Sequence, residues 1–279
     1  MSDHLSSHYK IQRAREHLEL LQKELRASIG SPDSYEIVDE TEDKEVTDET
    51  RRVILRRSVV FNVDIPTLRL GVLIGDVISN CRSALDHVIY SISFSRNPDE
   101  FRTDRTTEFP ISDNRDAFHR PRRRSWKPLH QIRGIPPEAQ AIVEALQPYH
   151  GRKLTYEPLW IIREMSNIDK HRSIHLATFS GAEIELDLSN IDRSVTLHSH
   201  QVRPTGIVES GAVLAEIEMT IPNVDFTQTA MEMNKKLLFT VAFDYDTPMP
   251  GIYVLEGLSD VISYVEGVVG ALERFVSPI

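Results

Sequence analysis

The stretch Leu70 to Ser93, LGVLIGDVISNCRSALDHVIYSIS, decides the fold, because it is the longest segment with a periodic apolar pattern. Its apolar residues recur every three or four positions, which is the period of an α-helix with one buried face. They are Leu70, Leu73, Val77, Cys81, Ala84 or Leu85, Val88 and Ile92. We therefore predict a long central helix against which other parts of the chain pack.

A polar stripe runs along the opposite side of this predicted helix. Its members are Asp76, Asn80, Ser83 and His87, with Arg82 and Asp86 beside it. Helices ordinarily show a polar face to water, and Arg82 with Asp86 has the spacing of an ordinary ion pair within a helix. The stripe is nevertheless the first candidate for a functional site.

Four further segments are predicted to be helices. Residues 4–28 and 258–276 are amphipathic, and the segments 136–146 and 158–172 begin at prolines, which favour the first turn of a helix. In the first segment one face collects Ile11, Ala14, Leu18, Leu21 and Leu25. That face packs either inside a bundle or along a dimer seam.

Short alternating segments predict β-strands. Two of them form a hairpin over residues 35–63, with the acidic stretch TEDKEVTDET as its solvated tip. From Ile174 onward, five more segments alternate: SIHLATF, AEIELDL, SVTLHSH, AEIEMTI and KKLLFTVAFDY. We expect an antiparallel sheet, which the hairpin is a candidate to join.

The predicted fold class is α+β, a helical bundle with a C-terminal antiparallel β lobe and a closing C-terminal helix. Residues 1–173 form the bundle, with the hairpin inserted at 35–63. Residues 174–257 form the β lobe, and residues 258–279 form the C-terminal helix, which packs back on the bundle.

Composition narrows the class of protein. The 279 residues carry a net charge of −10, which argues against non-specific coating of nucleic acid. We expect no membrane partner, because no run of eighteen apolar residues lacks a charge. The start of the chain has no signal-peptide pattern, and the single cysteine, Cys81, cannot form an internal disulfide. A cytoplasmic location is predicted.

One local region is basic in spite of the overall charge. The polar, proline-rich region 96–133 contains the run RPRRRSW. Its Arg122, Arg123 and Arg124 are suited to contact phosphate, and Trp126 is suited to stack on a base. The alternative is that the run is only a solvated or partly disordered loop.

Polar residues gather again towards the end of the predicted helix 158–172. They are Asn167, Asp169, Lys170, His171 and Arg172. Glu164, Asn167 and His171 share one side of that helix. The cations suit the negative end of a helix dipole, and the group could also form a polar network or a site shared with Arg82 and His87.

The segment NCRSALDH places four residues between Arg82 and His87, and it resembles the R-x4-H signature of HEPN domains, a superfamily of helical bundles. The resemblance implies a metal-independent ribonuclease in which His87 transfers protons at the ribose 2′-hydroxyl and Arg82 stabilises the phosphate. It also implies a homodimer with a composite site and no cofactor. Histidine and arginine are chemically suited to these roles.

The chain is also similar to a group of uncharacterised bacterial proteins that pair a segment like LRSALDH with a later segment like N-x-x-DKHR. Here these are CRSALDH, with Cys81 in place of the usual leucine, and residues 167–172. The leading interpretation is a HEPN-like endoribonuclease of toxin or phage-defence type. Asn80, Asn167, Lys170 and His171 would then orient or bind the RNA.

Two other interpretations remain. In the first, the protein is a non-catalytic ligand-binding or protein-interaction module, in which RSALDH and DKHR form a structural polar network. In the second, a metal is bound by some of Asp76, His87, Asp169, His171 and His175. No H-E-x-x-H motif supports the metal site, so we expect none.

Overall fold

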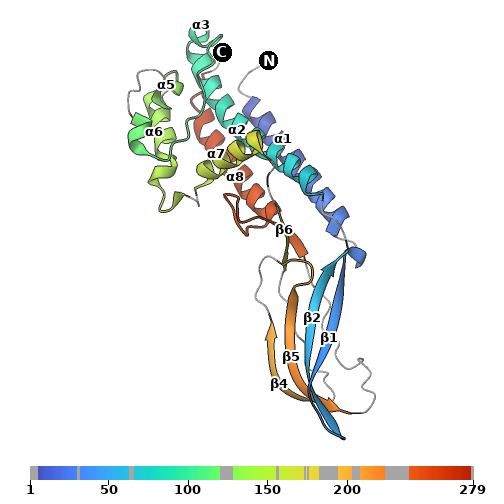
Figure 1. The fold of residues 1–279 in the computed structure, drawn as a ribbon. Coiled ribbons are helices and arrows are strands. Elements are labelled where there is room, and N and C mark those ends of the chain that lie inside the picture. The colour runs from blue at the N-terminus through green and yellow to red at the C-terminus, as the bar shows by residue number, and fades with distance from the viewer. Residues whose placement is uncertain are drawn as a thin grey trace. The chain divides into compact units, whose positions relative to one another are not determined.

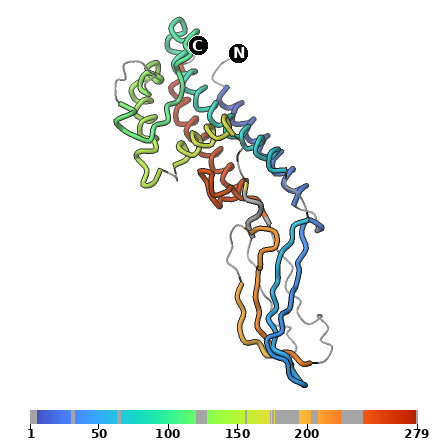
Figure 2. The backbone as a smooth tube through the Cα atoms, in the orientation of Figure 1, coloured from blue at the N-terminus to red at the C-terminus, as the bar shows by residue number. Residues whose placement is uncertain are grey.

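The computed structural model describes residues 6–29, 32–62, 66–119, 128–154, 157–172, 174, 176–181, 194–202, 208–223 and 239–277. The fold is α+β, as predicted from the sequence. The chain divides into two compact units, which Figures 1 and 2 trace from end to end. The helical unit comprises residues 1–24, 67–176 and 243–279, and the sheet unit comprises residues 25–66 and 177–242. Each unit is thus assembled from segments that are distant in the sequence.

The centre of the helical unit is the helix α2 (Thr67–Arg96), which contains the whole stretch predicted to be helical. Every apolar position predicted to face the core is buried, including both Ala84 and Leu85. The helix packs against α7 (Pro158–His171) and α8 (Val254–Glu273). Burial raises the pKa of Cys81 to about 12, so its thiol stays protonated in the core.

The helix α1 (Ser6–Ile29) has the apolar face predicted for it. Its Ile11, Ala14, Leu21 and Leu25 are buried, and Leu18 is half-buried. Ion pairs tie its polar side to two other helices. Arg15 lies 2.5 Å from Glu266 of α8, and Glu24 lies 2.6 Å from Arg69 of α2. The apolar face is therefore covered within one chain, as the bundle alternative predicts.

The polar region that follows α2 is packed more closely than its composition suggests. It contains the short helices α3 (Pro98–Phe101), α4 (Arg115–His119) and α5 (Pro128–Gln131), and α6 (Pro137–Ala145) follows. Its large apolar side chains Phe101, Phe109, Phe118 and Ile132 are buried. The described part of this region therefore contributes buried apolar side chains to the helical unit.

The basic run predicted to contact phosphate lies outside the described residues. It contains Arg122, Arg123, Arg124 and Trp126. Among the helices that are described, none is long and apolar enough to cross a membrane.

The sheet unit contains four antiparallel strands in the order β1-β2-β5-β4. They are β1 (Tyr35–Val46), β2 (Thr50–Phe61), β4 (Thr196–Val202) and β5 (Val213–Pro222). The hairpin joins the later strands through β2 and β5, where Leu55 lies opposite Ile217. Both residues belong to one buried cluster, together with Val53, Met219 and Ile221.

Two further strands, β3 (Leu176–Gly181) and β6 (Phe239–Phe243), pair with each other. The segment AEIELDL, which was also predicted to be a strand, lies outside the described residues.

The acidic stretch of the hairpin is mostly strand rather than tip. β1 continues to Val46, so that only residues 47–49 separate it from β2. Basic residues on the neighbouring strands pair with it: Arg56 lies 2.6 Å from Glu42 and 3.0 Å from Glu216. Opposite charges on adjacent strands favour the paired, extended backbone, and this explains why so acidic a segment extends the sheet.

Candidate functional site

A cavity of about 460 Å³ lies beside α2 in the helical unit. Arg82 and Asp86 of α2 line one wall, and a polar face of α7 lines another. The segment Glu108–Ile111 and residues of α4 and α5 complete the lining. Besides Arg82 and Asp86, the residues are Glu108, Phe109, Pro110, Ile111, Ala117, Pro128, Gln131, Arg163, Ser166, Asn167 and Lys170.

The face of α7 towards the cavity follows from helical spacing. Arg163, Ser166, Asn167 and Lys170 stand at positions i, i+3, i+4 and i+7, which lie on one side of a helix. The buried residues of the same helix, Leu159, Ile161, Ile162 and Met165, attach it to the core. The core contacts of α7 therefore determine which polar side chains meet α2.

Arg82 and Asp86 form an ion pair one turn apart on α2. Nη2 of Arg82 lies 3.0 Å from Oδ1 of Asp86. The same Oδ1 accepts a hydrogen bond of 2.9 Å from the backbone N–H of Phe109. This contact attaches the segment Glu108–Ile111 to the central helix.

The environment of Asp86 makes its carboxyl group unusual. Burial raises the pKa of Asp86 to about 6, and nearby Glu108 adds to the effect. Arg82, the Phe109 amide and Lys170 oppose the increase. Because a group with this pKa gains and loses a proton near neutral pH, Asp86 is chemically suited to proton transfer.

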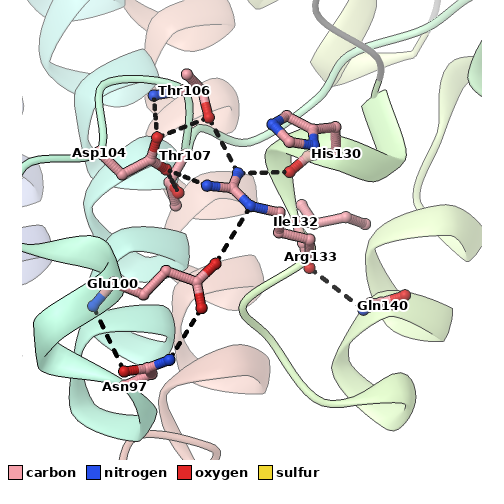
Figure 3. A network of polar contacts seen from close by, with 9 residues as sticks. All are labelled: Asn97, Glu100, Asp104, Thr106, Thr107, His130, Ile132, Arg133 and Gln140. Carbon is pink, nitrogen blue, oxygen red and sulfur yellow. Dashed lines mark hydrogen bonds and ion pairs between the residues drawn. The ribbon is translucent and has the colours of Figure 1, made fainter.

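The chain on either side of the cavity segment Glu108–Ile111 and of Gln131 is held by an arginine that joins two segments (Figure 3). The guanidinium of Arg133 lies 3.1 Å from Oδ2 of Asp104 and 3.6 Å from Oε1 of Glu100. It donates hydrogen bonds of 3.0 Å to Oγ1 of Thr106 and 3.0 Å to the backbone oxygen of His130. These contacts fix the chain just before Glu108 and on both sides of Gln131.

Asp104 is the acidic partner that most strongly binds this arginine. Burial alone would raise the pKa of Asp104, but hydrogen bonds from Thr107 and Thr106 and the charge of Arg133 lower it to about 2. The carboxylate therefore stays ionised throughout the neutral range, in the state that pairs with Arg133 (Figure 3).

Two glutamines complete the support of the wall. Gln131 of α5 donates a hydrogen bond to Glu108. The buried Gln147 donates to the backbone oxygen of Pro110 at 3.0 Å and accepts from the N–H of Ser112 at 2.8 Å. The segment Glu108–Ile111 is thus held from both ends, which pre-organises the cavity.

The three cations of the cavity are not equivalent. Arg163 is neutralised by Asp113 at 3.0 Å and Glu164 at 2.8 Å. Lys170 attracts Asp86 and Asp169 at longer range, but in the described structure it forms no hydrogen bond or ion pair. Lys170 is therefore the cation most available to an anionic ligand.

The cavity brings together part of the site predicted from the sequence. Arg82 and Asp86 meet Asn167 and Lys170 of the DKHR-like segment. The other predicted site residues of α2 and α7 do not line the cavity. They are Asp76, Asn80, Ser83, His87, Asp169, His171 and Arg172.

Several of these outlying residues have local structural contacts. Asn80 donates to the backbone oxygen of Asp76 at 2.8 Å, and the Asp76 carboxylate lies 3.7 Å from Nδ1 of His17. Asp169 packs against Gly75 of α2, where a Cβ atom would collide with its carboxylate. Burial raises the pKa of Asp169, Asp76 adds to this effect, and Lys170 opposes it.

The polar face of α7 that lines the cavity differs from the one considered from the sequence. The pattern of Glu164, Asn167 and His171 drew attention to a neighbouring side of the helix. The cavity side could have been recognised from the helical spacing of four polar residues, Arg163, Ser166, Asn167 and Lys170. Asn167 belongs to both patterns. No local signal marked Glu108 and Phe109, because they reach the cavity only through long-range contacts.

Metal ligands are not grouped in the described part of the chain, where no cluster of three or more His, Cys, Asp or Glu side chains could hold an ion. His175, one of the candidate ligands, lies outside the described residues.

Known proteins offer no match to this chain: none was found among family models, curated proteins or solved structures.

Proposed function

We propose that the α2–α7 cavity binds a phosphate-bearing ligand, and that the protein is a HEPN-like, metal-independent endoribonuclease acting on RNA at this cavity. The observation that carries the proposal is the meeting of Arg82 with Lys170 and Asn167 in one cavity. The two segments that carry the sequence resemblance thereby contribute to the same site.

The side chains of the cavity suit a phosphodiester. An arginine has five N–H donors in a planar fork, so Arg82 can hold a phosphate while it remains paired with Asp86. Lys170 adds a compact positive charge, and Asn167 adds donor and acceptor groups for a sugar or base. The volume of about 460 Å³ lies in the usual range of small-ligand pockets and suits a single nucleotide unit.

The wider parts of the resemblance belong to the same proposal. These are a homodimer and a role as a toxin or in phage defence. Neither is needed for the phosphate contacts described above, since Arg82, Asn167 and Lys170 come from one chain.

A second candidate is a non-catalytic binding module. It is favoured by the pairing of Arg82 with Asp86 and by the position of His87, which does not line the cavity. In this case the cavity holds its ligand without cleaving it.

Lys170→Met tests the proposed phosphate contact. We expect it to weaken the binding of a fluorescein-labelled single-stranded RNA about tenfold, because a charged hydrogen bond is lost in the cavity. Binding is measured by fluorescence anisotropy with EDTA present. Lys23→Met, at an exposed position of α1, is the matched control.

The same samples separate the two candidate functions. Cleavage of the RNA by the native protein in EDTA, with loss in Lys170→Met, supports the ribonuclease. Binding that depends on Lys170 without any cleavage supports the binding module. Equal affinity of Lys170→Met and Lys23→Met for the RNA would contradict a phosphate site in the cavity.

A further inference from the structure

We infer that Asp86, rather than the adjacent His87, is the group that takes the proton from the attacking 2′-hydroxyl at this cavity. The inference rests on the proposed ribonuclease function and deepens it by naming the proton acceptor. It departs from the role that the HEPN resemblance implies for His87.

The first argument is position on the helix. Successive residues of an α-helix point about 100° apart, so neighbouring side chains face different directions. Asp86 stands one turn after Arg82 and lines the cavity with it, whereas His87 does not line it. A base must come within hydrogen-bond reach of the proton that it removes, and of these two residues only Asp86 lines the cavity.

The second argument is the state of the two carboxylate oxygens. The contacts with Arg82 and with the Phe109 amide both involve Oδ1. Oδ2 has no hydrogen-bond partner in the described structure. One oxygen therefore anchors the side chain, and the other remains able to accept a proton.

The third argument is the placement of the phosphate. Arg82 retains N–H donors beyond the one directed at Asp86, so a phosphate held by them lies next to the carboxylate. Lys170 reaches the same cavity from α7. A phosphodiester bound between Arg82 and Lys170 therefore lies beside the Asp86 carboxylate and shares the cavity with the Lys170 ammonium group.

The reaction step balances without a further reactant. The ribose O2′ forms a bond to phosphorus while the bond from phosphorus to O5′ breaks. The 2′-hydroxyl proton passes to Oδ2 of Asp86, and the leaving O5′ takes a proton from Lys170. The products are a 2′,3′-cyclic phosphate and a 5′-hydroxyl end, and exchange with water then restores both side chains.

The electrostatics agree with this role. Arg82 from α2, Glu108 from the wall segment and Lys170 from α7 all act on Asp86, and burial raises the pKa of its carboxyl to about 6. The group is therefore mostly ionised at pH 7 and basic enough to accept a proton transiently.

The test compares Asp86→Asn, His87→Gln and Asp99→Asn in the full chain, with EDTA present. Asparagine keeps an oxygen for the Phe109 amide but cannot take the proton, and Asp99 is an exposed position of α3 with the same change of charge. Cleavage is followed on a labelled single-stranded RNA. Binding is followed separately on its uncleavable 2′-deoxy analogue.

We expect Asp86→Asn to lower the cleavage rate about 100-fold or more, as the loss of a general base does. It should bind the 2′-deoxy analogue at least as tightly as the native protein, because a negative charge is removed beside Arg82. His87→Gln and Asp99→Asn should cleave within about threefold of the native rate, a change below 1 kcal/mol.

Other results overturn the inference in distinguishable ways. Loss of cleavage in His87→Gln but not in Asp86→Asn rejects Asp86 and leaves the ribonuclease function standing. Binding without cleavage by the native protein rejects the proton transfer and leaves the binding module. Neither binding nor cleavage by the native protein rejects both the inference and the proposed function.

A second measurement covers the case in which Asp86→Asn does not fold. The carboxyl carbon of Asp86 is titrated by NMR in the native protein, with and without the 2′-deoxy analogue. A phosphate bound beside Asp86 must raise its pKa. An unchanged titration with saturating analogue would overturn the inference.

Discussion

Gly134 is a position where one methyl group decides the packing. A Cβ atom there would lie 2.5 Å from Cζ of Phe101 and 2.5 Å from Cβ of Ser93. Ser93 is fully buried on α2, so its Cβ cannot move without the helix backbone. We expect Gly134→Ala to lower the free energy of unfolding by about 1–3 kcal/mol, measured by urea denaturation.

Gly267 of α8 is the matched control. A Cβ atom there meets no described atom within 4 Å. Gly267→Ala should therefore raise the free energy of unfolding by about 0.5–1 kcal/mol, because alanine is the better helix former. Equal changes in the two variants would show that the space around these glycines does not control stability. The structure also indicates that Gly267 is not needed for close helix contact.

The relation between Arg82 and its neighbours on α2 shows what residue spacing alone can predict. A separation of four residues brings two side chains to the same side of a helix, and a separation of five turns them about 140° apart. Arg82 accordingly pairs with Asp86 at 3.0 Å, while His87 lies away from the cavity lining. Helical spacing therefore accounts for the local pairing of Arg82 with Asp86.

The hairpin is held by a pair of charges that lie directly opposite each other. Nε of Arg57 donates to Oδ1 of Asp39 at 2.6 Å, and Nη2 donates to Oδ2 at 2.5 Å. The arginine side chain is only 13% exposed. Arg57→Met should lower the free energy of unfolding by about 1–3 kcal/mol, because Asp39 loses its partner in a partly buried place. Urea denaturation, followed by circular dichroism in the β-sheet region of the spectrum, measures the change.

Arg51→Met on the same strand is the control for this prediction. Its nearest ion-pair distance is 3.9 Å, to Asp43, and its side chain is 36% exposed. The expected loss is about 0–1 kcal/mol, as for other surface pairs. If Arg51→Met proved as destabilising as Arg57→Met, the geometry of the pair would not account for its stability.

The elements themselves differ in how far sequence patterns predict them. The apolar period of α2 predicted its buried residues correctly, because that period depends only on neighbours three and four positions away. The polar faces of α7 have similar local patterns, and only the packing against α2 selects one of them. The acidic end of β1 resembles a loop tip in sequence because the basic residue that pairs with it, Arg56, belongs to another strand.

The stability of the molecule should depend on pH through Asp104. The pKa of this carboxyl is about 2 in the folded protein, below its ordinary value near 3.8. The folded state therefore binds fewer protons than the unfolded state, so the contribution of Asp104 is complete above about pH 5 and disappears as the pH falls towards 2. The pKa of Asp86 is raised to about 6 in the folded protein, so here the folded state binds more protons than the unfolded state. The contribution of Asp86 to stability therefore decreases as the pH rises towards 6.

Asp104→Asn isolates this effect. We expect the melting temperature of the variant to be below that of the native protein at pH 6, and the difference to shrink as the pH falls to about 2. Thermal unfolding followed by circular dichroism across this range gives the comparison. A difference that stays constant with pH would mean that the ionised carboxylate is not the source of the stability.

Local patterns were sufficient to predict the α+β class, the central helix, the N-terminal and C-terminal helices and the hairpin. Each of these depends on the period of apolar residues within one segment. The pairing of β2 with β5, the packing of Phe101 and Phe109 and the cavity beside Arg82 were decided by the tertiary structure. They arise from contacts between residues far apart in the chain, and no local period records which distant segments will meet.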